Sequence, residues 1–124
     1  MGAQLIWIAG WQHQCCGEDF AVGSAVTWNV HEPDRTWFTT TLGPDLSRRL
    51  DAVEGHHADR VDRVVNGTVR SIEAVHCAYD QESGRWVPGT ATRTRQDPAD
   101  RWTPDRDGRK FIGYLVRVQV TPAA

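Results

Sequence analysis

Apolar and polar residues alternate along several stretches of this chain, and this period of two predicts β-strands. In one stretch Val26, Trp28 and Val30 alternate with polar neighbours. Gly23, which lies before them, predicts a bulge or bend of the kind that curls a sheet into a small barrel. Strands of this type are expected at residues 4–11, 20–30, 35–42 and 110–120.

One stretch has helical spacing instead of alternation. Pro44 suits the first position of a helix, and Gly55 suits the position just after its end. Leu46, Leu50 and Val53 lie between them at intervals that place them on one face. We therefore expect a single helix from Pro44 to just before Gly55.

Turn signals divide the second half of the chain. Asn66-Gly67 predicts a hairpin, because both central positions of such a turn favour positive φ. A second turn is expected at residues 83–84, followed by a short strand at 85–87. Residues 89–108 are polar and rich in Asp and Pro, which predicts a long surface loop.

Together these elements predict a mainly β fold. Several short strands, Gly-rich turns and one short α-helix are typical of a small curled antiparallel sheet or barrel, SH3-like or OB-like in size. The 124 residues are enough for one hydrophobic core and too few for two domains. We expect residues 1–124 to form a single globular domain.

Charge and cysteine content restrict the partners and the compartment. Lys and Arg number 14 and Asp and Glu 16, a net charge of −2. Nucleic acid and anionic membranes are therefore not expected as partners. The first residues lack the basic region of a signal peptide, and three cysteines do not form a disulfide framework. We expect a cytoplasmic protein with reduced thiols.

Cysteine and histidine residues cluster at three places that could converge on a metal ion. Zn²⁺ takes three or four sulfur and nitrogen ligands, and the three clusters offer that mixture. In a strand His76 and Cys77 point to opposite faces, so only one of them suits a shared site. The preferred ligand set is Cys15, Cys16, His57 and Cys77, with His56, His76 and Glu18 as alternates.

Two other interpretations of these clusters stay open. Cys77 also suits a small buried apolar position, and a histidine pair at a helix end is often simply solvated. Alternatively, Cys15 or Cys16 is a reactive thiolate activated by a histidine. If a metal is bound, four protein ligands make a structural site. Three ligands and a water make a catalytic one, for which Glu18 is a candidate base.

Six tryptophans are many for this length. Trp7 and Trp28 suit strand positions that face a core. Trp86 and Trp102 each follow an arginine in polar surroundings, and they are the best candidates for an exposed surface that stacks against a ligand.

The stretch WQHQCCGEDFAVG resembles the signature of a family of small bacterial proteins of unknown function, W-Q-x-Q-C-C-G-x-x-F-x-V-G. The likeness continues through a histidine pair, a G-x-V-x-x-I strand and a closing F-x-G-Y-L strand. The matching residues are Trp11, Gln12, Gln14, Cys15, Cys16, Gly17, Phe20, Val22, Gly23, His56, His57, Gly67, Val69, Ile72, Phe111, Gly113, Tyr114 and Leu115. The resemblance implies a stand-alone domain and no established activity.

The sequence thus favours a binding or accessory module with a structural zinc ion, whose partner is an unidentified protein or small molecule. The alternative is a small enzyme that uses an open zinc site or an activated cysteine.

Overall fold

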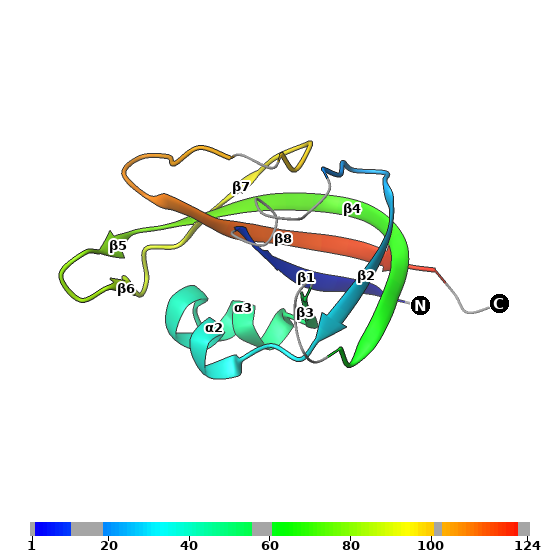
Figure 1. Cartoon of the computed structure of the whole chain (residues 1–124), viewed down its shortest axis with the longest axis horizontal. Coiled ribbons are helices and arrows are strands. Elements are labelled where there is room, and N and C mark those ends of the chain that lie inside the picture. Colours follow the sequence, from blue (N-terminus) through cyan, green and yellow to red (C-terminus); the bar gives the residue numbers. More distant parts are fainter. Residues whose placement is uncertain (1, 11–18, 56–60, 101–102, 122–124) are drawn as a thin grey trace.

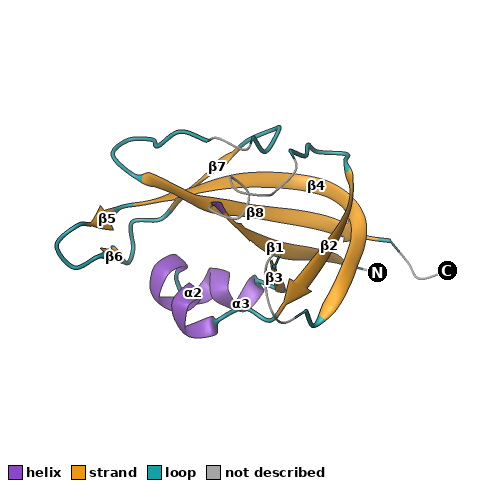
Figure 2. Ribbon diagram, in the orientation of Figure 1, coloured by secondary structure: helices purple, strands orange, loops and turns teal. Residues whose placement is uncertain are grey.

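The computed structural model describes residues 2–10, 19–55, 61–100 and 103–121. Figure 1 shows a curled sheet with two short helices on one side, and Figure 2 shows how strongly strand dominates over helix. The strands are β1 (Ala3–Ala9), β2 (Ala25–His31), β3 (Ala52–Glu54), β4 (Arg63–Cys77), β5 (Tyr79–Asp80), β6 (Arg85–Trp86), β7 (Thr92–Arg95) and β8 (Lys110–Val120). The helices are α2 (Arg35–Leu42) and α3 (Pro44–Arg49).

Five of the strands close into a barrel. Their order is β2-β3-β1-β8-β4, and β4 pairs again with β2 to complete the circle. β1 and β3 are parallel and the other neighbours are antiparallel, so the barrel is mixed. The mainly β barrel predicted from the sequence is confirmed. β7 extends the sheet beyond β4, and β5 and β6 form a separate hairpin.

The barrel strands bury apolar side chains on both faces. Alternate residues of β1 separate the two sides: Ile6 and Ile8 face the barrel interior, and Leu5 and Trp7 face outward. We call the apolar cluster inside the barrel the interior core and the cluster between the barrel and the helices the outer core. Burial on both faces explains why β1 contains a run of apolar residues in addition to alternation.

The third predicted strand, at residues 35–42, is wrong, because this segment is the helix α2. The Asp34 side chain caps its first turn by accepting a hydrogen bond from the Trp37 backbone N–H at 3.2 Å. Phe38 and Thr41, three residues apart, are buried. Burial of the Phe38 ring against the outer core outweighs the β preference of the Thr-rich sequence.

The predicted helix from Pro44 ends earlier than expected, at Arg49. The chain leaves the helix at Leu50, and residues 52–54 form β3 beside β1. Asp51 makes this change possible: its backbone N–H donates to the Leu5 carbonyl at 2.9 Å, and its carboxylate accepts from the Leu5 N–H at 2.8 Å. Pairing with β1 therefore replaces the second half of the predicted helix.

The predicted hairpin at Asn66-Gly67 is also wrong, because β4 runs without a break through both residues. Gly67 is required for a different reason. A Cβ atom there would overlap the Gln119 carbonyl and lie 2.6 Å from Val118 Cγ1. The glycine marks a close approach of β4 to β8, where no turn exists.

Other boundaries follow the sequence more closely. Strand β8 spans residues 110–120 as predicted, and the turn at residues 83–84 joins β5 to β6. Gly23 adopts a φ of 93° in the turn before β2, which confirms the expected bend. The stretch 89–108, expected as a surface loop, contains β7 and two buried residues, Ala99 and Thr103.

Candidate functional site

Three strand termini meet at one end of the barrel. β1 ends opposite Gly113 near the start of β8, and β4 ends beside the same part of β8. The backbone of Gly10 lies against the Phe111 ring, because a Cβ atom on Gly10 would be 2.9 Å from that ring. This barrel end therefore gathers segments that are far apart in the sequence.

His76 is buried at this barrel end with one ring nitrogen unpartnered. The side chain is 2% exposed and packs against Phe111, with ring centroids 5.7 Å apart. Nε2 lies 2.9 Å from the Pro104 carbonyl oxygen, which can only accept, so Nε2 carries the proton. Nδ1 is buried and has no hydrogen-bond partner among the described residues. The arrangement leaves a buried nitrogen lone pair in the neutral imidazole.

Cys77 lies on the opposite face of β4, as strand alternation predicts. It is fully buried in the outer core. Its sulfur lies 3.6 Å from the Val87 carbonyl oxygen, to which it donates, and 3.4 Å from Thr90 Oγ1. These contacts occupy the thiol, and of the two neighbours it is His76 that faces the barrel end.

Most of the predicted ligands fall outside the described residues. This applies to Cys15, Cys16, Glu18, His56 and His57, and to the candidate surface residue Trp102. Within the described ranges, no group of three or more His, Cys, Asp or Glu side chains could hold a metal ion. The zinc site thus stays a prediction.

The other candidate surface residue, Trp86, is half-buried. Its ring packs edge-on against Tyr79, with centroids 4.9 Å apart, and against the outer core. Trp86 lies in the small β5–β6 hairpin, and these contacts cover part of its ring.

A polar cluster seals the barrel interior beneath the segment that follows β7. The Tyr114 hydroxyl donates to the Asp100 carbonyl at 2.7 Å and accepts from Gln96 Nε2 at 3.1 Å. Thr103 Oγ1 is also hydrogen-bonded to this hydroxyl. Burial raises the pKa of Tyr114 above its ordinary value of 10.0, although the Thr103 hydrogen bond opposes the shift. The cluster ties the 96–103 segment to β8 and is structural.

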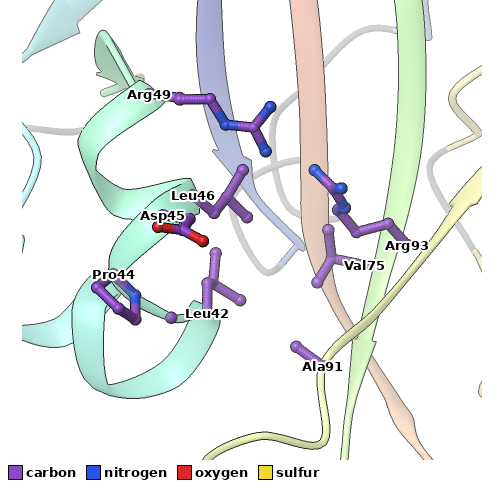
Figure 3. Close-up of a pocket in the computed structure, with 9 residues that line it drawn as sticks. Leu42, Pro44, Asp45, Leu46, Arg49, Val75, Ala91 and Arg93 are labelled. Atoms are coloured by element: carbon purple, nitrogen blue, oxygen red, sulfur yellow. The ribbon is translucent and has the colours of Figure 1, made fainter.

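A pocket of about 330 Å³ opens on the outer face between α3 and β7. Figure 3 shows side chains from both elements pointing into it. Its apolar part consists of Leu42 and Leu46 on the helix side and Val75 and Ala91 on the sheet side. The sequence gives little sign of this site, because its two sides come from segments that only the folded barrel brings together.

Two arginines line the same pocket. Arg49 extends from the last turn of α3 and Arg93 from β7, and Figure 3 shows both guanidinium groups beside the space between the elements. Arg93 Nη1 lies 3.8 Å from Glu73 Oε1, beyond hydrogen-bond distance. Asp45 also lines the pocket, but its carboxylate is paired with Arg48. A repeated Thr-Arg pattern at residues 92–95 was the only hint of this site in the sequence.

Comparison with protein families gives one match, to the Family of unknown function (DUF6578), over residues 3–120. The expected membership of a family of unknown function is confirmed, whereas the two-cysteine signature stays a prediction. Comparison with curated proteins and with solved structures found no match. Among the described residues no helix is long and apolar enough to cross a membrane.

Proposed function

Since the chain belongs to a family of unknown function, we propose its role from its own residues: a small β-barrel binding or accessory module stabilised at one end by a structural zinc ion. The proposed ligands are Cys15, Cys16 and His57 together with His76, which replaces Cys77 in the set. The proposed setting is the reducing cytoplasm, where thiols stay available as zinc ligands.

The observation that carries this proposal is the state of His76. Zinc-bound histidines usually donate their second N–H to a carbonyl or carboxylate, which orients the ring toward the metal. His76 has that arrangement, with Nε2 at the Pro104 carbonyl and Nδ1 buried without a partner in the part of the chain that the structure describes. A buried nitrogen that makes no hydrogen bond is costly, and a metal ion would satisfy it.

The topology supports the approach of the two cysteines to His76. Gly10 is the last described residue before the two cysteines, and Gly55 is the last before the histidine pair. Gly10 directly follows β1, and its backbone lies against the Phe111 ring that packs on His76. Gly55 directly follows β3 and donates its backbone N–H to the Asn29 carbonyl in β2. An extended chain spans at most about 3.5 Å per residue, so the five residues from Gly10 to Cys15 reach up to about 18 Å and the two from Gly55 to His57 up to about 7 Å.

The test is elemental analysis of protein purified without added metal. We expect about one zinc per chain, as for a closed tetrahedral site. Cys16→Ser and His76→Gln should lose the metal, and Cys77→Ala should keep it, because its sulfur lies in the outer core. Circular dichroism after refolding with zinc separates loss of the metal from loss of the fold.

Zinc well below one equivalent in the parent protein would contradict the proposal. Zinc retained by His76→Gln and lost by Cys77→Ala would return Cys77 to the ligand set. The enzyme alternative has its own signature: one cysteine that is alkylated rapidly at neutral pH whether or not a chelator is present. Zinc-bound thiolates should instead be alkylated slowly until the metal is removed.

A further inference from the structure

We propose that the pocket between α3 and β7 binds a small organic acid, with its carboxylate held by Arg49 and Arg93 and its aliphatic tail on the apolar floor. The site lies on the outer face of the barrel. It is independent of the zinc proposed for the barrel end.

The protein balances the charge of the two arginines only in part. Arg49 has no carboxylate within 4 Å among the described residues. Among the described residues Arg93 has one carboxylate within 4 Å, that of Glu73 at 3.8 Å, which forms an ion pair with it but no hydrogen bond. Two guanidinium groups that face one space repel each other, and an anion between them converts that repulsion into two charge-assisted hydrogen-bonded pairs.

The floor of the pocket defines the rest of the ligand. Leu46 and Val75 are members of the outer core, and Leu42 and Ala91 pack against its edge. These four side chains are aliphatic, so the floor offers burial to a hydrocarbon tail and no hydrogen bond to a sugar or a base. The volume of about 330 Å³ is at the small end for ligand sites and suits a tail of modest length.

The same features exclude other ligand classes. A cationic ligand would meet two arginines, since the Asp45 carboxylate is already paired with Arg48. A strongly hydrated anion such as inorganic phosphate would satisfy the arginines but leave the apolar floor uncovered. An acid with a single charge and an apolar tail uses both parts of the site.

The experiment is calorimetric titration of the full chain with octanoate, at low ionic strength. Octanol tests the tail without the charge, acetate the charge without the tail, and phosphate the anion alone. We expect saturable 1:1 binding of octanoate, and affinity at least about tenfold weaker for each of the other three.

Matched arginine variants locate the site. Arg49→Gln and Arg93→Gln should each weaken octanoate binding about tenfold, because each removes one charged hydrogen-bond donor. Arg70→Gln and Arg95→Gln are the controls, since both arginines are exposed and neither lines the pocket. Ala91→Leu should also weaken binding by filling the floor.

Three results would overturn the proposal: no saturable octanoate binding, equal binding of octanol, or equal losses in the control variants. Tight binding of phosphate without octanoate binding would also overturn it. All variants change surface or edge positions, so unchanged thermal unfolding shows that the fold is retained. Repeating the titration after chelation separates this site from the proposed zinc, because octanoate affinity should not change.

Discussion

The interior core and the outer core differ in what closes them. Inside the barrel, five strands joined by a continuous hydrogen-bond ladder surround Ile6, Val69 and Val116, all with no exposed surface. The outer core is covered by two short helices that belong to no ladder, as Figure 1 shows. Backbone hydrogen bonds join the five barrel strands without a gap. Among the described residues the helices have no such bonds to the sheet and contact it only through side chains. The pocket opens along that junction.

The comparison also separates stability from ligand binding. The barrel interior is sealed by polar contacts around Tyr114 and by Phe20, whose ring packs against Trp28 and Tyr114. The outer face instead places two arginines beside an incomplete apolar cover. We infer that the interior holds the fold and that the outer face is the side on which small ligands bind.

The largest effect is expected in the interior core. Ile6→Ala removes three carbons from a fully buried position in the barrel and should lower the free energy of unfolding by about 4 kcal/mol. Urea denaturation followed by tryptophan fluorescence measures this. Val64→Ala is the control, because Val64 is 52% exposed and its truncation should cost about 0.5 kcal/mol or less. Similar losses for both variants would contradict the division into interior and surface.

A smaller and more local effect is expected in the outer core. Phe38→Ala removes a ring that packs edge-on against Trp7, with centroids 5.6 Å apart, and should cost about 3 kcal/mol. Hydrogen exchange should show faster exchange in α2 and α3 while the barrel strands keep their protection. Thr40→Ala, on the exposed face of α2, is the control. Equal loss of protection in the barrel strands would show that the two cores unfold as one unit.

The smallest effect concerns the seal of the barrel. Tyr114→Phe keeps the ring and removes the hydroxyl, which leaves the Asp100 carbonyl and Gln96 amide without this partner and should cost about 2 kcal/mol. Urea denaturation at neutral pH measures the loss. Tyr79→Phe is the control, because Tyr79 is 38% exposed.

The pH dependence of the same residue has a definite sign. Burial raises the pKa of Tyr114 in the folded state, so the folded protein holds this proton more tightly than the unfolded chain. Its contribution is complete below the unfolded value of 10.0 and is lost as the pH rises above it. Stability of the parent should therefore fall more steeply above pH 10 than that of Tyr114→Phe. Parallel curves would contradict this assignment.

Local sequence patterns predicted the structure well where an apolar run or a turn residue is clearly bounded in the sequence. β8 could be predicted to the residue because its apolar run is bounded by polar residues, and Gly23 could be read as a bend. Residues 35–42 could not be predicted, since Thr and Trp favour strands, but a capping aspartate and a place for the Phe38 ring decided the helix. The hairpin predicted at Asn66-Gly67 was wrong because Gly67 is needed for a close contact between β4 and β8, and no turn forms there.

The candidate sites divide in the same way. His76 and Cys77 could be assigned to opposite faces from strand alternation alone, and the structure agrees. The sequence did not show which of the two better suits a metal ion. That choice depends on the hydrogen bond of His76 to the Pro104 carbonyl and on the contacts of the Cys77 thiol in the outer core. The arginine pocket gave almost no signal, because Arg49 and Arg93 are brought together only when β7 pairs with β4 beside the helices.

The sequence alone determined the class of fold, most of the strands and the alternation that separates the faces of β4. These depend on the side-chain period of the backbone and on burial of apolar residues, which act within a few neighbours. Tertiary structure decided the closure of β2 on β4, the replacement of half a helix by β3, and the pocket on the outer face. Each of these depends on contacts between distant segments, whose free energy exceeds the local preferences that a sequence displays.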